Sequence, residues 1–101
     1  MRNDKKIILI FGRHEDVSVY KDSIRHFIRE KGMAQKFQVI SALPTEGNIA
    51  GCRNLNRLAS VIVIGKIPKS DLTAIKQNCR LEVLRETEIN ILFKNLFKNL
   101  N

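Results

Sequence analysis

Two short apolar runs, KKIILIFG at residues 5–12 and ASVIVIGK at residues 59–66, constrain the fold of this chain more than any other feature. Runs of this length without alternation between apolar and polar residues are typical of strands that are buried on both faces of a sheet. Such strands need helices on both sides and parallel neighbours. The two runs therefore predict the centre of a parallel sheet.

The segments around these runs predict four helices and two more strands. Apolar side chains recur at helical spacing in four groups: Val17, Tyr20, Ile24, Phe27 and Ile28; Ile49, Cys52, Leu55 and Leu58; Leu72, Ile75 and Cys79; and Ile89, Leu92, Phe93, Leu96, Phe97 and Leu100. Gly32 supplies a stop for the first helix, Ser70 is the expected N-cap of the third, and the last helix is expected to begin near Thr87. Residues 37–43 and 81–85 predict the two outer strands.

Strands and helices thus alternate to the end of the chain, which predicts a mostly parallel sheet with helices on both faces. Because crossovers between parallel strands are right-handed, few arrangements are open, and the strand order 2-1-3-4 places both apolar runs at the centre. We therefore expect a three-layer α/β fold of the Rossmann-like or flavodoxin-like kind. A length of 101 residues is enough for one core without disulfides or metals, so residues 1–101 predict a single α/β domain.

The net charge of +8 and the pI of about 9.9 favour polyanionic partners: nucleic acid, a phosphate-bearing small molecule or anionic lipid. The 18 basic side chains are spread along the chain and form no basic arm. The apolar run at residues 7–11 is too short for a signal peptide or a membrane span, so a cytoplasmic protein with no membrane contact is expected. Cys52 and Cys79 lack the spacing of metal ligands, which predicts buried free thiols, no metal and no cofactor.

A glycine and basic residues follow both apolar runs. In a parallel sheet the carboxyl ends of the first and third strands meet at one crevice, which is where folds of this class bind ligands. Glycine lets the backbone approach a ligand closely, and the following helices direct free N–H groups into the same crevice. The expected anion-binding residues are Gly12, Arg13, His14, Gly65, Lys66, Lys69 and Ser70. The alternative is that the glycines form ordinary turns and the bases are solvated, because neither the dinucleotide-binding nor the P-loop glycine pattern is present.

His14 is the candidate for acid–base chemistry in this group. A histidine at the N-terminus of a helix can act as a general base or as a second ligand for an anion. The spacing identifies no cysteine, serine or carboxylate partner, so no catalytic set is assigned. The alternative for His14 is a plain surface residue.

Several segments carry a resemblance to a known family: IILIFGRHE, Tyr20-Lys21, ASVIVIG, Ala74-Ile75-Lys76 with Cys79, and the amphipathic last helix. Together these segments resemble the small bacterial family known as domain of unknown function number 2325 over nearly the whole chain. The family places Gly-Gly-His-Glu after its first strand and Ser-His at the start of a later helix. In this chain Arg13 stands at the second glycine and Pro68-Lys69 at the Ser-His position, while His14 is retained. The resemblance thus implies one histidine exchanged for lysine, which favours anion binding over metal or acid–base chemistry, and it implies no established activity.

These observations predict a non-catalytic binding or regulatory module that recognises a phosphate-bearing ligand or nucleic acid at the crevice between the first and third strands. One alternative is a small phosphoryl-transfer or nuclease-type enzyme that uses His14. Another is an accessory protein that acts by self-association, as a homodimer formed through a sheet edge or through the last helix.

Overall fold

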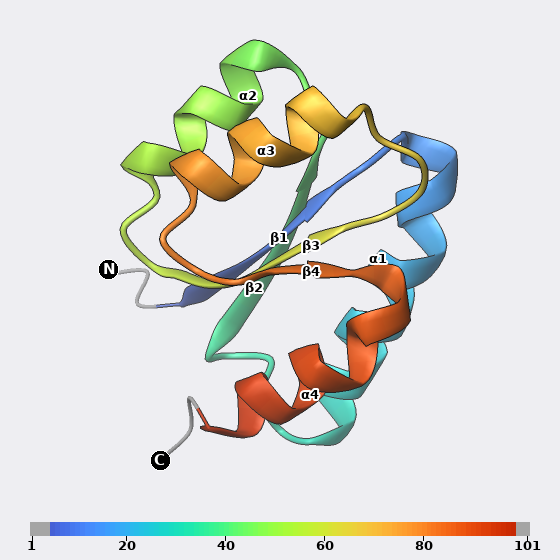
Figure 1. Cartoon of the computed structure of the whole chain (residues 1–101). Helices are drawn as coiled ribbons and strands as arrows, with labels where there is room; N and C mark the ends of the chain where they lie inside the picture. The colour runs from blue at the N-terminus through green and yellow to red at the C-terminus, as the bar shows by residue number, and fades with distance from the viewer. Residues whose placement is uncertain (1–4, 99–101) are drawn as a thin grey trace.

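A parallel four-stranded sheet lies between two layers of helices in a computed structural model that describes residues 5–98 (Figure 1). The strands are β1 (Lys6–Phe11), β2 (Phe37–Ala42), β3 (Leu58–Val63) and β4 (Val83–Arg85). The helices are α1 (His14–Glu30), α2 (Glu46–Gly51), α3 (Lys69–Asn78) and α4 (Ile89–Lys98), with 3-10 turns η1 (Cys52–Asn54) and η2 (Glu86–Glu88). The strand order is β2-β1-β3-β4 and every pairing is parallel. The three-layer α/β fold and the strand order expected from the sequence are confirmed.

Alternate side chains of β1 enter two separate cores. Ile8 and Ile10 pack in a cluster that joins the sheet to α1 and α4. Leu9 and Phe11 pack in a second cluster, with side chains of η1, α2 and α3. All four are buried, and β3 alternates between the same two clusters. This pattern explains why residues 7–11 of β1 and residues 61–63 of β3 are apolar without alternation.

Helix α1 follows the apolar stripe that its sequence predicts. Val17, Ile24 and Ile28 are its buried residues and face the sheet. The helix ends where expected, because Gly32 adopts a φ of +69°, a conformation that side chains other than glycine rarely take. Helix α4, in the same layer, contacts α1 through stacked rings of Phe27 and Phe93, whose centroids are 4.1 Å apart.

The second predicted helix is shorter than its apolar pattern suggested. Helix α2 ends at Gly51 and continues as the 3-10 turn η1, after which Leu55 is extended. Leu58, expected on the helix, is instead the first residue of β3 and pairs with Ile7 of β1. A period of three or four residues describes a 3-10 turn as well as an α-helix, so the spacing alone did not locate this transition.

The N-cap predicted for the third helix is also wrong, by two residues, whereas the last helical segment begins close to Thr87 as expected. Helix α3 begins at Lys69 with Pro68 as its N-cap, because the Pro68 carbonyl accepts the N–H of Leu72 at 3.1 Å; Ser70 is therefore inside the helix. The last helix begins with the turn η2 before α4. Leu100 and the side chain of Phe97, both expected on its apolar stripe, lie outside what the structure describes. None of the helices within residues 5–98 is long and apolar enough to cross a membrane.

Gly12 marks the closest approach between the end of β1 and its surroundings. A Cβ atom at this position would lie 2.7 Å from Cγ2 of Val17 and 3.0 Å from the carbonyl oxygen of Ile64. Both neighbours belong to the protein itself, so the missing side chain is needed for packing between β1, β3 and the first turn of α1. The need for glycine here follows from sterics and not from a ligand.

We expect Gly12→Ala to lower the free energy of unfolding by about 1–3 kcal/mol, because the added methyl group forces a shift in a packed region. Gly47→Ala is the matched control, since a Cβ atom there would meet nothing within 4 Å. In a helix that substitution is expected to be neutral or to stabilise the protein by up to about 1 kcal/mol. Urea denaturation of both variants measures the difference, and equal stabilities would contradict the steric explanation.

Candidate functional site

The carboxyl ends of β1 and β3 lie side by side, as the sequence predicted. Phe11 pairs with Val63, and the N–H of Ile64 donates to the carbonyl of Phe11 at 2.9 Å. The loops that follow therefore leave the sheet together. The two segments expected to border the crevice, Gly12-Arg13-His14 and Gly65-Lys66, are therefore neighbours, and the name crevice is kept for the surface between them.

Carboxylates of the protein itself occupy the β3 side of this crevice. The N–H of Gly65 donates to Oε2 of Glu86 at 2.8 Å, and the carbonyl of Gly65 accepts the guanidinium of Arg85 at 2.7 Å. The carboxylate of Asp16 lies against the same glycine, with Oδ2 3.0 Å from the place of a Cβ atom. Gly65 has a φ of +80°, so a side chain would be strained there. The backbone donor that the sequence assigned to an anion is already bound to an internal carboxylate.

The basic residues of the crevice remain exposed to solvent. Arg13 is the N-cap of α1 and His14 its first residue, and no side chain caps either this helix or α3. Lys66, Lys69 and Ser70 are exposed around the start of α3. These side chains are free to bind an anion, although Asp16 and Glu86 place negative charge beside them. Anion binding by Gly12, Arg13, His14, Gly65, Lys66, Lys69 and Ser70 stays a prediction.

The imidazole of His14 makes no hydrogen bond or ion pair within residues 5–98. His26 differs, because its Nε2 lies 3.0 Å from Oε1 of Glu30 on the exposed face of α1. Among the described residues, no group of three or more His, Cys, Asp or Glu side chains could hold a metal ion. Nothing in this part of the chain therefore orients His14 for proton transfer.

The opposite end of the sheet carries most of the positive charge. We call this surface the amino face and define it as the residues that lead into and start each strand, together with the last turn of each helix. Its basic members are Lys5, Lys6, Arg29, Lys31, Lys36, Arg53, Arg57, Lys76, Arg80 and Lys98. Its acidic members within residues 5–98 are Glu30 and Glu82. Ten basic residues therefore stand against two acidic ones.

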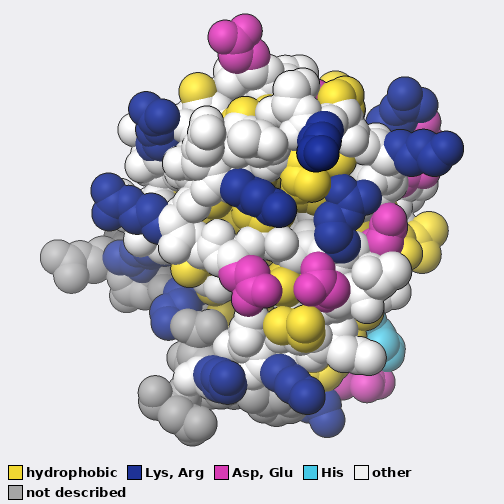
Figure 2. All heavy atoms as spheres, in the orientation of Figure 1, with side chains coloured by type: hydrophobic (Ala, Val, Ile, Leu, Met, Phe, Trp, Pro, Cys, Tyr) yellow, Lys and Arg dark blue, Asp and Glu magenta, His cyan; other side chains and the backbone are white. Residues whose placement is uncertain are grey.

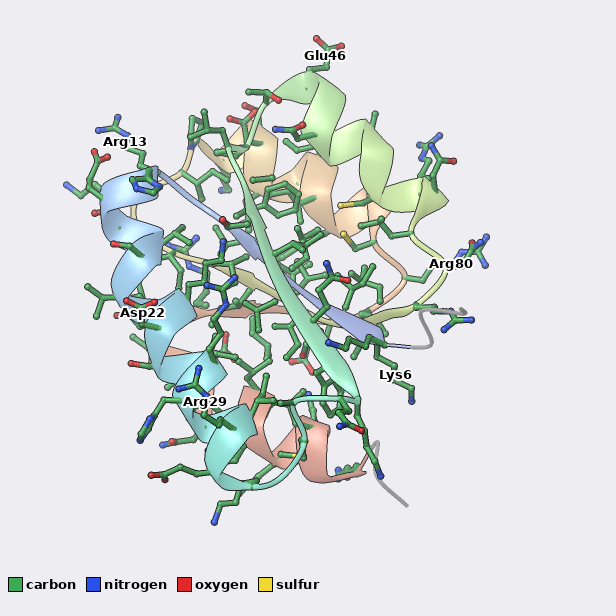
Figure 3. All side chains as sticks on the ribbon, turned by 180° about the vertical axis from the view of Figure 1, so that it is seen from behind. Lys6, Arg13, Asp22, Arg29, Glu46 and Arg80 are labelled. Carbon is green, nitrogen blue, oxygen red and sulfur yellow. The ribbon has the colours of Figure 1, made fainter. Side chains whose placement is uncertain are left out.

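The carboxyl end has the reverse balance when it is defined in the same way, by strand ends, the following loops and the first turn of each helix. Its basic members are Arg13, Lys66, Lys69 and Arg85, and its acidic members are Glu15, Asp16, Glu46, Asp71, Glu86 and Glu88. Arg13 lies at one end of the sheet, while Lys6 and Arg80 lie at the other (Figure 3). Lys and Arg side chains also follow one another down the left margin of the surface in Figure 2, where β1 and β3 begin.

Helix macrodipoles account for part of this separation. Acidic residues are favoured in the first turn of a helix and basic residues in the last, and all helices here run antiparallel to the strands. Lys5, Lys6, Lys36 and Arg57, however, belong to strand starts and to loops between elements. These positions gain little from a helix dipole, so the charge of the amino face exceeds what helix stability requires.

The amino face was not among the sites predicted from the sequence, although its signal is present there. Each predicted strand is preceded or begun by a base: Lys5 and Lys6, Lys36, Arg57 and Arg80. These basic residues are some 20 to 30 positions apart, so they form no cluster in the sequence. Only the parallel topology brings them to one end of the molecule.

Cys52 and Cys79 are buried free thiols, as expected, and lie between the sheet and the layer of α2 and α3. Burial raises the pKa of both thiols. For Cys79, burial and a hydrogen bond to Cys52 raise the pKa to about 12. The two thiols are therefore protonated and unreactive near neutral pH.

The raised pKa of Cys79 predicts a loss of stability at alkaline pH. In the unfolded chain the thiol loses its proton near pH 8.5, while in the folded protein it keeps the proton to about pH 12. The stabilising contribution is therefore fully present below about pH 8.5 and is lost as the pH rises through this window, by up to about 1.4 kcal/mol per pH unit. Urea denaturation between pH 8 and pH 10.5 measures this fall in the free energy of unfolding.

Cys79→Ala is the control for this prediction, because it removes this thiol and leaves the rest of the chain unchanged. The variant should lose the part of the pH dependence that belongs to the thiol. Identical pH dependence in both proteins would show that Cys79 does not contribute.

Arg13→Ala and Lys69→Ala test the crevice. Each removes an exposed charge, so each should weaken the binding of inorganic pyrophosphate by roughly 10- to 150-fold, the range of one ionic hydrogen bond, while stability stays within about 0.5 kcal/mol. Glu86→Gln keeps an acceptor for the N–H of Gly65 and removes a negative charge, so it should strengthen the binding. Titration calorimetry at low salt measures all three, and unchanged affinity in both alanine variants removes the crevice from consideration.

Comparison with known proteins gives no family and no function for this chain. No family model matches it, and no curated protein or solved structure matches it either. The resemblance to domain of unknown function number 2325 stays a prediction, and the candidate sites rest on the geometry of this chain alone.

Proposed function

We propose that the protein is a binding module for nucleic acid, and that it holds the phosphate backbone on its amino face. The observation that carries this proposal is the balance, within residues 5–98, of ten basic residues against two acidic ones at that end of the sheet. Neutralisation of phosphates by Lys and Arg supplies most of the affinity in sequence-independent binding to nucleic acid. The sequence already favoured a polyanion, and the fold supports a specific surface for it.

The breadth of the amino face supports a polymer over a single phosphate group. The outer two of the four strands are about 14 Å apart at a spacing of roughly 4.8 Å per strand, and helices extend the surface on both sides of the sheet. Lys98 of α4 lies beside the starts of β3 and β4, where it shares a depression with Leu58 and Glu82. Arg53 of η1 lies on the other side of the sheet. A surface of this extent can contact several phosphates at once.

At least five of the basic side chains on the amino face have no carboxylate partner in the described part of the chain. Arg29, Lys36, Arg53, Lys76 and Arg80 make no ion pair with a carboxylate of residues 5–98. At the carboxyl end, by contrast, Glu86 is bound to Gly65 and lies 4.0 Å from Arg85. Unpaired cations displace the counterions of a polyanion when they bind it, which favours binding at low salt.

The crevice is a second candidate, for a small phosphate-bearing ligand. The observation that favours it is the pair of helix N-termini, of α1 and α3, that no side chain caps. Free N–H groups at such ends bind anions. Binding at the crevice and binding at the amino face use different lysines, so paired variants separate them.

Two double variants of equal charge test the proposal. Lys6→Ala/Lys36→Ala removes two exposed lysines whose backbones are joined by a hydrogen bond of 2.9 Å at the starts of β1 and β2. Lys66→Ala/Lys69→Ala removes two exposed lysines at the carboxyl end and is the matched control. A labelled single-stranded 20-mer is titrated by fluorescence anisotropy at several salt concentrations.

The wild type should bind with a steep salt dependence. The amino-face variant should bind more weakly, with a log–log slope that is smaller by about 0.7 for each phosphate that its lysines no longer neutralise. The control variant should keep both the affinity and the slope. If the control is weakened as much as the amino-face variant, the phosphates lie at the crevice. Binding to phosphatidylserine vesicles but not to the oligonucleotide would contradict the nucleic-acid assignment and favour a lipid surface.

A further inference from the structure

A cavity of about 470 Å³ opens on the amino face between η1 and the C-terminal end of α3. Its volume lies within the roughly 300–1,000 Å³ that is typical of sites for small molecules. Residues of two kinds line it: an apolar wall that includes Cys52 and Leu81, and polar side chains that include Arg53, Asn56, Gln77 and Arg80. Nothing in the proposed binding of a phosphate backbone requires a cavity of this size.

Two arginines flank the cavity, and each follows one of the buried cysteines along the chain. Arg53 and Arg80 are exposed and have no ion pair or hydrogen bond within residues 5–98. A guanidinium is planar, stacks on aromatic faces and donates to phosphate oxygens. The two side chains can therefore contact either the flat face of a ring or the phosphate attached to it.

Amide side chains add groups that can recognise the edge of a ring. Nδ2 of Asn78 donates to the carbonyl of Ala74 at 2.7 Å, which leaves its Oδ1 available as an acceptor. The side-chain amides of Asn56 and Gln77 are exposed and make no hydrogen bond within the described part of the chain, so each offers both a donor and an acceptor. Donors and acceptors on a cavity rim match the polar edge of a nucleobase.

The apolar wall suits the faces of the same ring. Leu55, Leu58 and Leu81 line the cavity beside Cys52, whose raised pKa keeps it uncharged. The aromatic side chains of the described residues do not line this cavity. A base that enters would therefore have both leucine side chains and guanidinium planes within reach.

We propose that this cavity accepts one unpaired nucleobase of a strand whose phosphates lie on the amino face. The inference rests on the proposed function and deepens it, because it assigns the bound class as single-stranded nucleic acid. A base that is paired and stacked in a duplex cannot enter the cavity without being taken out of the helix, which costs a few kcal/mol. Single strands are therefore bound in preference to duplexes of equal charge.

An abasic oligonucleotide separates the contribution of bases from that of phosphates. It keeps every phosphate of the matching single strand and lacks the rings. The wild type should bind the strand with bases about 5- to 150-fold more tightly than the abasic strand, which corresponds to the roughly 1–3 kcal/mol that stacking of one base contributes. Both should show a similar salt slope, because the number of phosphates is the same.

Arg53→Lys/Arg80→Lys tests the cavity without changing the net charge. It removes both guanidinium planes and keeps both charges, so the ratio between the two strands should fall below about threefold, while affinity for the abasic strand changes much less than affinity for the strand with bases. Arg13→Lys/Arg25→Lys is the matched control and should keep the wild-type ratio, because both residues are exposed, lie off the amino face and do not line the cavity. Equal changes of Tm in the two double variants would show that stability is not the cause of any difference.

These experiments can reject the base site without rejecting the binding of phosphates on the amino face. Equal affinity for both strands with a steep salt slope would overturn the base site and leave backbone binding on the amino face in place. A wild-type ratio in Arg53→Lys/Arg80→Lys would likewise overturn the base site. A failure of every oligonucleotide to bind at low salt would overturn both.

Discussion

The parallel pairing of β1 with β3 is the interaction on which the rest of the molecule depends. Each strand sends alternate side chains into two cores, one under α1 and α4 and the other under α2 and α3. Among the described residues, the buried side chains of each helix layer belong to one core only, so these strands hold both layers in one domain. The pairing also places the ends of β1 and β3 next to each other, which fixes the position of the loops after Phe11 and after Val63.

The two ends of the sheet differ because of what the chain places around the central pair. At the carboxyl end, the protein fills its own anion-binding position: Glu86 accepts the N–H of Gly65, and Arg85 donates to its carbonyl. At the amino end, bases occur before every strand and carboxylates are few among the described residues. Ligand binding at the carboxyl ends of strands is a general property of this class of fold. In this chain, the distribution of charged side chains instead favours binding of a polyanion at the amino ends of the strands.

The sequence predicted the architecture because its strongest pattern coincides with the strongest physical constraint. Strands buried on both faces must be apolar throughout, so residues 5–12 and 59–66 located the centre of the sheet and led to the order 2-1-3-4. The end of α2 at Gly51 was missed because 3-10 and α-helical spacing are alike, and Ser70 was misplaced because Pro68 caps α3 through its carbonyl alone. The environment of the crevice could not be predicted from local patterns, since Gly65 and Glu86 are 21 positions apart and meet only through the geometry of η2. The amino face was not predicted for a related reason. Its basic residues are far apart in the sequence, and only the crossover connections between parallel strands bring them together.

The opposite charges at the two ends give the molecule a permanent electric dipole along the strands. Side chains and helix dipoles act in opposite senses here, since the positive helix N-termini lie at the acidic end, and whole charges outweigh the half charge of a helix end. The electric field of a polyanion orients such a molecule before contact, so that its amino end faces the polyanion. A larger fraction of encounters then begins in an orientation that permits binding. The charge separation therefore raises the association rate constant as well as the affinity.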